Sequence, residues 1–457
     1  MSKKILFISS FHPLISRNII NTSIVKLLQE YYQVIVLVPN FKLFYFEKEF
    51  KNKGLIFEGI DVGSLIRTKR VGILKRLAEA LPPTHRALMG RKLTLTGVKK
   101  NFFYYYLFYL PASLLGRSHF LMNLIRYFDY FCSPRGRFFY LFKKYKPDLI
   151  FSTDIQNEHD VALLQDAKKY NIPTISMVRS WDNLVTRAIR IIPEEIIVHN
   201  EIIKEQAVTL YGIKPSIIEV AGIPHYDRYL KGSRKSRETF FEDLSFDLHK
   251  KTVLFFPLCD YRVTRNTDKS GVNMDGEILE TLAKLNVNVV VRFPPNETVS
   301  IGGFKKPENF FYDKPGYFFE NNIITTREIT DEDNEQLIDE LTYTDVVVSG
   351  PSTAVIDSAF FDVPAIFVDF NSNKKEGDIG QVFEYKSEHI VNVIETLGVK
   401  IARSPDELLT MINNYFLNRQ GDSEGRKRIV REQCFATDGR ASERVASVII
   451  SRLSSKK

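Results

Sequence analysis

A small polar turn between two regular patterns carries the clearest potential for chemistry in this sequence. Three valines at 346–348 precede the turn, and an amphipathic pattern begins at Ala354. This order predicts a strand, a tight turn and a helix, with Pro351 near the first helical position, where a missing N–H costs little. Amide groups at a helix start, together with nearby hydroxyls, form a neutral site for an anion. The candidate residues for this site are Ser349, Gly350, Pro351, Ser352 and Thr353.

Two charged residues could extend this turn into a nucleotide site. Asp357 lies one helical turn further along, where its carboxylate could accept a hydrogen bond from a ribose hydroxyl. Arg292 follows an apolar run and could contact a nucleotide phosphate from the end of a strand. An ordinary capped turn of a parallel sheet would show the same local pattern, and this alternative stays open.

Three side chains in the first half of the chain could act as acids or bases. Each follows a run of apolar residues that predicts a buried strand, and they are His12, Asp154 and Asp182. Because the carboxyl ends of parallel strands meet at one edge of a sheet, we expect all three at the same rim. A carboxylate there could deprotonate an acceptor hydroxyl, and Asp154 is the preferred candidate. Asp154 and Asp182 could instead be turn or helix-cap residues, and His12 could be an incidental histidine of a loop.

The sequence offers no convincing metal site. Asp331 and Asp333 form an Asp-x-Asp pair, but Thr330 stands three residues before Asp333, which is typical of a capped helix start. We therefore favour capping. The three cysteines are far apart and form no metal or redox spacing, which suits a reducing compartment.

These candidate residues require two α/β domains to position them. A chain of 457 residues is too long for one ordinary domain. Strand and helix patterns alternate from the start of the chain, and they restart at about residue 252 after an exposed, charged linker. We predict a first Rossmann-like, doubly wound domain over 1–232, a second over 233–435, and a C-terminal helix over 436–457 that crosses back to the first.

The first domain contains an unusual basic and aromatic segment over residues 64–146. It holds 17 lysines and arginines against two acidic residues, a net charge of +15 compared with +8 for the whole chain. Aromatic runs at 102–110 and 138–142 lie among these cations. Cations beside aromatic rings suit an anionic membrane surface. A buried helical insert is the main alternative, and nucleic-acid binding is disfavoured because no recognition motif accompanies the charge. No run of about 18 apolar residues predicts a membrane span.

Several segments of the chain resemble one enzyme family. They are SGPSTAVIDSAFFDVPAIF at 349–367, GIPHYDRY at 222–229, SWDN at 180–183, the pair His389-Ile390, and RIVREQCFATDGRASERVASVI at 428–449. With these segments the chain resembles GT-B glycosyltransferases of bacterial surface-polysaccharide synthesis. More narrowly, it is similar to the branch that includes CDP-glycerol glycerophosphotransferases and UDP-GlcNAc 2-epimerases. The resemblance covers most of residues 145–450 and leaves the basic aromatic segment outside.

The resemblance implies a fold and a set of roles. Two Rossmann-like domains would face a cleft, with the first holding the acceptor and the second the nucleotide donor. The turn and helix start at 349–357 would hold the donor diphosphate, Asp357 the ribose, and His389 would lie near the phosphates. Pro294 stands where the family segment Arg-x-His-Pro would have a histidine, so no catalytic role is transferred to that position.

The function that the resemblance implies is sugar transfer without an obligatory metal or a cofactor. The donor would be a nucleotide-sugar, and the acceptor a lipid-linked or cell-surface glycan such as capsule, O-antigen or a teichoic-type polymer. A polyol-phosphate transferase that uses CDP-glycerol or CDP-ribitol is the first alternative. A 2-epimerase or a non-enzymatic membrane-surface protein is the second. We expect a cytoplasmic protein, peripheral on the inner face of the plasma membrane, that does not bind nucleic acid.

Overall fold

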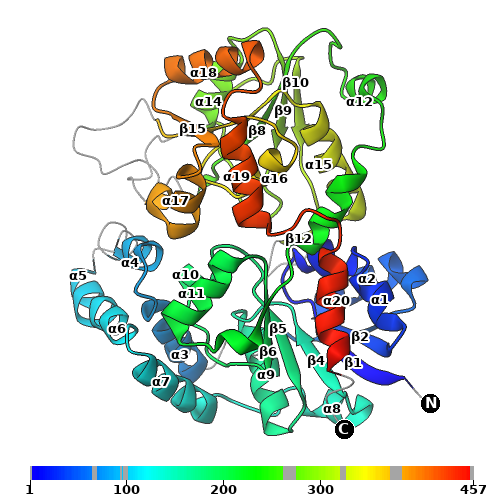
Figure 1. Cartoon of the computed structure of the whole chain (residues 1–457), viewed down its shortest axis with the longest axis vertical. Coiled ribbons are helices and arrows are strands. Elements are labelled where there is room, and N and C mark those ends of the chain that lie inside the picture. Colours follow the sequence, from blue (N-terminus) through cyan, green and yellow to red (C-terminus); the bar gives the residue numbers. More distant parts are fainter. Residues whose placement is uncertain are drawn as a thin grey trace.

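The computed structural model contains two parallel β-sheets, one above the other, each flanked by helices (Figure 1). The structure describes residues 3–63, 69–92, 95, 101–260, 274–319, 326–370 and 383–452. Apolar strand residues are buried on both faces of each sheet, as parallel strands connected by helices require. The predicted class, α/β with two doubly wound sheets, is confirmed.

The first sheet has seven strands in the order β3-β2-β1-β4-β5-β6-β7. The strands are β1 (Lys4–Ser9), β2 (Tyr32–Pro39), β3 (Ile56–Ile60), β4 (Leu149–Ser152), β5 (Thr174–Met177), β6 (Glu195–Val198) and β7 (Ile218–Val220). The strand order reverses between β1 and β4, and this reversal opens a crevice beyond the carboxyl ends of these two strands.

The second sheet has six parallel strands in the order β10-β9-β8-β13-β14-β15. They are β8 (Thr252–Phe256), β9 (Asn288–Arg292), β10 (Phe310–Asp313), β13 (Val346–Ser349), β14 (Ala365–Val368) and β15 (Val399–Ala402). Its order reverses between β8 and β13, so the turn after β13 lies at the second crevice.

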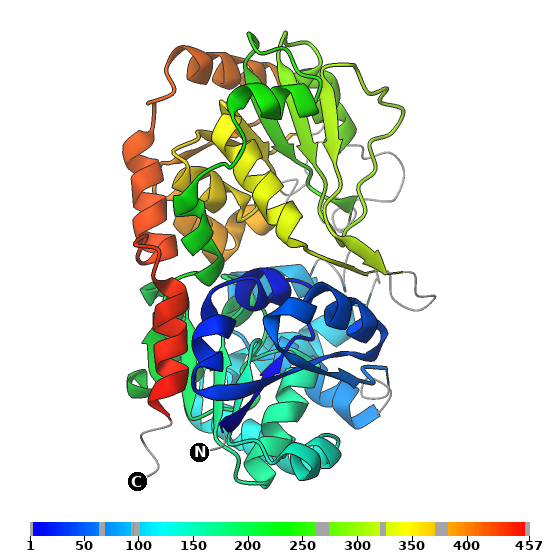
Figure 2. The ribbon, with the colours of Figure 1, turned by 90° about the vertical axis from the view of Figure 1, so that its right-hand side faces the viewer.

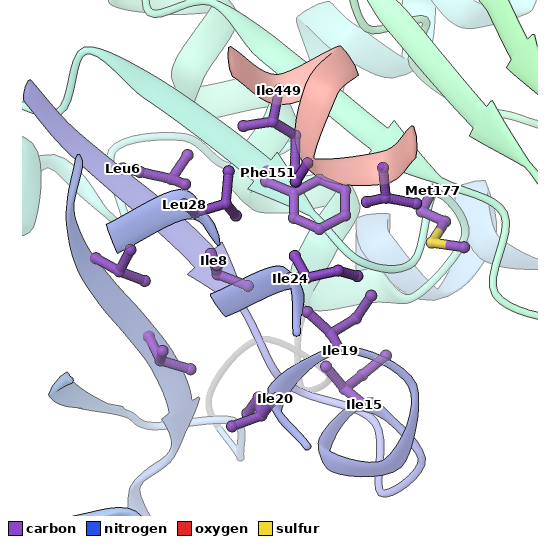
Figure 3. Close-up of a cluster of buried hydrophobic side chains, with 14 of the residues drawn as sticks. Leu6, Ile8, Ile15, Ile19, Ile20, Ile24, Leu28, Phe151, Met177 and Ile449 are labelled. Carbon is purple, nitrogen blue, oxygen red and sulfur yellow. The ribbon is translucent and has the colours of Figure 1, made fainter. Parts of the chain in front are cut away.

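The C-terminal helix α20 (Ala441–Ser451) belongs spatially to the first sheet. After α19 (Ser423–Cys434) beside the upper sheet, the chain runs down to α20 along the lower one (Figures 1 and 2). Ile449 of α20 lies in the cluster of buried side chains that Leu6, Phe151 and Met177 also form (Figure 3). The Tyr32 hydroxyl donates a hydrogen bond of 3.1 Å to the Ile449 carbonyl. The last helix therefore joins the two halves of the chain.

A hairpin of the second half makes another contact between the halves. Strands β11 (Tyr317–Phe319) and β12 (Thr326–Glu328) pair in an antiparallel manner and pack on α2 (Leu43–Glu49) of the first domain. The Tyr45 and Tyr317 rings stack with centroids 4.6 Å apart. Lys42 and Glu328 form a buried ion pair of 2.6 Å.

The basic aromatic segment is largely helical and lies between β3 and β4. Its helices are α3 (Lys69–Ala80), α4 (His85–Lys92), α5 (Phe102–Tyr104), the π-helical turn η6 (Tyr105–Tyr109), α6 (Leu110–Leu115), α7 (His119–Cys132) and α8 (Phe139–Tyr145). Helices α4 to α7 extend along one side of the lower domain (Figure 1). Residues 64–68, 93–94 and 96–100 of this segment lie outside the described residues.

Candidate active site

The predicted anion-binding turn follows β13 and leads into α16 (Ala354–Phe360). A cavity of about 300 Å³ lies at the ends of β8, β9 and β13, and Ser352 and Thr353 are among its lining residues. Ser349 is fully buried, and its hydroxyl donates to the Gly350 carbonyl at 2.8 Å. Ser352 and Thr353 therefore face a ligand-sized space, which we call the donor cavity, while Ser349 shapes the turn behind it.

Gly350 is required by close packing in this turn. A Cβ atom at this position would lie 2.5 Å from Cγ of Leu258, which is far inside van der Waals contact. Pro351 follows it, before the first residue of α16. The backbone of the turn therefore lies against Leu258, which follows β8, and a side chain at position 350 would push the turn away.

Asp357 lines the donor cavity and also joins three segments of the chain. The Tyr229 hydroxyl donates to its Oδ1 at 2.8 Å, and Nη2 of Arg17 lies 3.7 Å from the same oxygen. Arg17 also donates to the Tyr229 hydroxyl at 2.9 Å. Tyr229 belongs to η8 (Pro224–Lys231), the helix between the two sheets, and Arg17 to the π-helical turn η1 (Ser16–Ile20) that follows β1. Asp357, the residue predicted to bind the ribose, is therefore part of the junction between the domains.

Arg292 lines the donor cavity, but its guanidinium is already engaged. Nη1 donates to Asp313 at 2.5 Å and to Glu340 at 2.9 Å, and Nη2 donates to the Asp333 carbonyl at 2.8 Å. Burial raises the pKa of Glu340 to about 8. These partners hold the guanidinium in the wall of the cavity, and contact between Arg292 and a phosphate stays a prediction.

The Asp-x-Asp pair caps a helix, as the sequence predicts. The Thr330 hydroxyl accepts from the Asp333 amide at 3.1 Å, and the Asp333 carboxylate accepts from the Thr330 amide at 2.8 Å. Asp331 pairs with Arg228 at 2.7 Å. In the part of the chain that the structure describes, no cluster of three or more metal-ligating side chains occurs.

A second cavity, of about 360 Å³, lies at the carboxyl ends of the first sheet. His12, Asp154 and Asp182 all line it, so the structure brings the three predicted acid–base candidates together. Helix α4 of the basic segment and α10 (Asn183–Thr186) complete its wall. We call it the first-domain cavity.

The Asp154 carboxylate is already engaged by hydrogen bonds within the protein. Its Oδ2 accepts from Nε of Arg179 at 2.7 Å, and its Oδ1 accepts from the amides of Gln156 and Asn157 at 3.0 and 3.2 Å. Burial would raise the pKa of Asp154, but the Arg179 guanidinium and these hydrogen bonds keep it below its ordinary value. With its lone pairs engaged, Asp154 anchors Arg179 and is a weak proton acceptor, contrary to its place as the preferred base.

His12 is suited to donate a hydrogen bond. The Leu14 amide donates to its Nδ1 at 3.2 Å, so the neutral ring carries its proton on Nε2. Burial, and next the Arg179 guanidinium, lower the pKa of His12 to about 3. The ring is therefore neutral at physiological pH and is a weak base.

The charge of a histidine in the other domain acts on Asp182. Burial would raise the pKa of Asp182, but His389 and then Arg179 lower it below its ordinary value. His389 belongs to α17 (Glu388–Ile394) of the second domain. An ionised carboxylate that interacts electrostatically with an imidazole can support proton transfer.

The basic segment holds α17 in this position. The amides of His85 and Arg86, at the start of α4, donate to the Glu388 carboxylate at 2.5 and 3.2 Å. Nη1 of Arg86 donates to the buried Glu384 at 3.1 Å. Helices α4 and α17 accordingly face each other between the two domains (Figure 1).

Four arginines that line the first-domain cavity were not identified as site residues from the sequence. They are Arg86, Arg91, Arg179 and Arg187. Arg179 lies two residues after the end of β5, and that position beyond the end of a parallel strand is a signal that could have identified it. Arg86 and Arg91 lie in the segment that we interpreted as a membrane-contacting surface.

The fold is similar to that of several solved structures. S. aureus MnaA in complex with UDP is similar with a TM-score of 0.56 and 12% identity, covering 99% of this chain and 97% of that one. UDP-GlcNAc 2-epimerase from Neisseria meningitidis, bound to UDP-GlcNAc, has a TM-score of 0.54 and 10% identity, covering 98% and 100%. The wall teichoic acid polymerase TagF has a TM-score of 0.50 and 14% identity, covering 99% and 90%. These similarities establish the predicted GT-B-like fold of two Rossmann-like domains.

Sequence comparison assigns the family. No curated protein matches this sequence significantly. However, the family model for CDP-glycerol:poly(glycerophosphate) glycerophosphotransferases matches residues 179–451, which is more than half of the chain. The matched region begins at Arg179 and includes Asp182, the turn after β13, and His389. The chain therefore belongs to the CDP-glycerol:poly(glycerophosphate) glycerophosphotransferase family.

Proposed function

We propose that this protein transfers a polyol phosphate from a CDP-polyol donor, such as CDP-glycerol, to a hydroxyl of a phosphate-containing cell-envelope polymer. The observation that carries the proposal is the family match over residues 179–451, which contains the donor turn as well as Asp182 and His389. This match favours polyol-phosphate transfer over the sugar transfer that the sequence analysis placed first.

The donor cavity suits the diphosphate of such a donor. Ser352 and Thr353 line it at the start of α16, and Asp357 lies one turn further along the same helix. Backbone amides and hydroxyls bind anionic oxygens without introducing a full positive charge. The Asp357 carboxylate would accept a hydrogen bond from the ribose while Tyr229 holds it from behind.

The reaction requires one proton transfer and one phosphoryl transfer. The acceptor hydroxyl attacks the phosphorus that carries the polyol, and a new P–O bond forms. The bond from this phosphorus to the oxygen that bridges the two phosphates breaks, and CMP leaves with the electron pair. His389 would accept the hydroxyl proton, and the negative charge of Asp182 would stabilise the resulting imidazolium. Positioning of the two substrates in the cleft supplies much of the remaining rate.

The basic segment suits an acceptor that is attached to a membrane lipid. On α7 the polar side chains Arg126 and Asp129 face inward: Arg126 donates to the carbonyls of Ile189 and Tyr211, and Asp129 binds Arg190. The outward side is apolar, and its exposed residues are Phe120, Leu124, Tyr127, Phe128 and Phe131. Met122 of α7 is buried in a hydrophobic cluster with Ile189 and Tyr211, so the helix packs by its inner face and leaves these rings exposed on the outer one.

The exposed apolar surface continues along the neighbouring helices. Phe103 is 80% exposed and Leu107 is 75% exposed, on α5 and η6. Rings and leucines that protrude beside a strongly cationic segment fit the interface of an anionic bilayer. Within the described residues, no helix is long and apolar enough to cross a membrane. We therefore propose that the segment contacts the membrane surface and brings the active site to lipid-linked acceptors.

The donor assignment can be tested directly. CDP-glycerol, CDP-ribitol and UDP-sugars would each be supplied with a polymer primer, and released CMP or UDP measured. We expect CMP release from a CDP-polyol, and CDP should stabilise the protein by about 2.7 kcal/mol at 100 times its Kd. Release of UDP from a UDP-sugar alone, with no response to CDP-polyols, would restore the sugar-transfer interpretation.

A further inference from the structure

The start of helix α4 contacts two segments that carry residues of the proposed site. One is α10, which begins directly after Asp182, and the other is α17, in which His389 is the second residue. Helix α4 packs against α10 and against η9 (Phe383–Lys386), the turn that leads into α17. A single helix start in the basic segment therefore links the segments of both proposed proton-transfer residues.

The contact with the second domain is a carboxylate at the helix start. The amides of His85 and Arg86 donate to Glu388 at 2.5 and 3.2 Å. Amides in the first turn of a helix have no partner within the helix, and a side chain close in sequence usually accepts from them. Here the acceptor comes from the other domain, and the helix dipole favours its negative charge. Because Glu388 directly precedes His389, this contact holds the backbone that carries the proposed base.

Thr84 makes the corresponding contact within the first domain. Its hydroxyl donates to the Val185 carbonyl at 2.6 Å and accepts from the Ala87 amide at 3.2 Å. Thr84 is only 4% exposed, so water does not compete with these bonds. Val185 lies in α10, three residues after Asp182. The same helix start thus holds the backbone next to the proposed carboxylate.

The rest of α4 is attached to the first domain and to the exposed aromatic helices. Arg91 of α4 and Arg187, which directly follows α10, pair with Glu79 at 2.6 and 3.6 Å. The Arg91 guanidinium also lies over the ring of Tyr109, 5.7 Å from its centroid. Tyr109 belongs to η6, which also carries the exposed Leu107. Helix α4 is therefore continuous with the surface that we propose to contact the membrane.

We propose that the start of α4 positions Asp182 and His389 across the two domains, with Thr84 and Glu388 as the positioning residues. The inference rests on the proposed function, in which His389 accepts a proton and Asp182 stabilises the imidazolium. Thr84 and Glu388 are not among the residues that line either cavity, so they act through their neighbours rather than on a substrate. Helix α4 precedes the matched family region at 179–451, so this positioning comes from a segment that the family model does not cover.

The test removes each contact and compares it with a matched control. Thr84→Val keeps the shape of the side chain without its hydroxyl, and Thr84→Ser keeps the hydroxyl. Thr281→Val is the control, because Thr281 is 2% exposed and donates to a carbonyl of its own helix at 2.7 Å. Glu388→Ala is compared with Glu407→Ala, since Glu407 accepts a backbone amide at 2.7 Å just before another helix of the second domain.

We expect kcat to fall about 10- to 100-fold in Thr84→Val and Glu388→Ala, because a shift of about 1 Å in a reacting group costs about 10²-fold. KM for the CDP-polyol and the affinity for CDP should stay unchanged. Thr84→Ser and both controls should turn over like the wild type. An equal loss in the controls, or a Thr84→Ser variant as slow as Thr84→Val, would overturn the proposal.

A second measurement does not depend on turnover. In protein with ¹³C-labelled histidine, the ring signal of His389 is assigned by its absence in His389→Gln, and it reports the surroundings of this imidazole. The signal should move in Thr84→Val and Glu388→Ala and stay in place in both controls. An unchanged signal in the two positioning variants would overturn the proposal. If the signal responds as expected but the wild type consumes no CDP-polyol, the positioning role stands and the proposed reaction fails.

Discussion

The two cavities of this protein differ in which of their charged side chains face the space inside. Around the donor cavity the charges are already satisfied: Arg292 is bound by Asp313 and Glu340, and Asp357 by Tyr229. What faces the ligand is a turn with hydroxyls and backbone amides. The first-domain cavity instead presents four arginines that are held from behind. The difference teaches that a turn can form an anion site from groups that are close in sequence, whereas the guanidinium groups of the first-domain cavity come from several elements.

The largest effect should come from the proposed proton-transfer residues, Asp182 and His389. Asp182→Asn and His389→Gln remove the carboxylate that would stabilise the imidazolium and the proposed base, so we expect turnover to fall about 10²- to 10⁴-fold. Binding of CDP should stay close to that of the wild type, because neither side chain lines the donor cavity. Rapid-mixing turnover and equilibrium CDP binding measure the two quantities. A matched loss of CDP affinity would place these residues in the donor site.

Gly350→Ala tests whether the donor cavity depends on backbone shape. The new Cβ would meet Leu258, so we expect a loss of about 1–3 kcal/mol in the free energy of unfolding and weaker CDP binding. Gly303→Ala is the control, because no atom lies within 4 Å of its added Cβ. Chemical denaturation and calorimetry report both properties, and an unaltered CDP affinity would contradict the assignment of the turn.

Removal of exposed rings should separate the acceptor side from the donor side. In Phe103→Ser and Phe120→Ser, vesicles with anionic lipids should bind about tenfold more weakly, since each change removes a large apolar side chain from the interface. Both rings are strongly exposed, at 80% and 76%, so folding should be retained. Phe44→Ser is the matched control, because Phe44 is 79% exposed on α2 of the same domain. Vesicle sedimentation measures the effect, and equal losses in the control would show that the surface is not specific.

The smallest effect concerns pH and the wall of the donor cavity. Burial raises the pKa of Glu340 to about 8, above its value of about 4.3 in an unfolded chain. The folded state then keeps a proton that the unfolded state loses, so the stability that Glu340 contributes decreases as the pH rises from about 4.3 to 8. Glu340→Gln should flatten this dependence in urea unfolding. Glu332→Gln, on the exposed side of the same helix, should keep the slope of the wild type.

The sequence alone was sufficient for the framework and for the local motifs. Apolar runs separated by amphipathic helices predict two parallel sheets, and the valines before Ser349 predict the turn after β13. The cap formed by Thr330 and Asp333 follows from three neighbouring residues. These features depend on contacts within a few residues or on burial of whole segments, and both are visible as patterns.

Only the tertiary structure decided which charges are available for chemistry. Arg292 and Asp154 both follow strands and both look accessible in the sequence, yet each is occupied by partners 21 to 48 residues away. Arg86 and Arg187 come from distant segments but line one cavity. Whether an ionisable side chain binds a ligand or another part of the protein depends on what packs against it, and such pairings across long separations leave no periodic signal in the sequence.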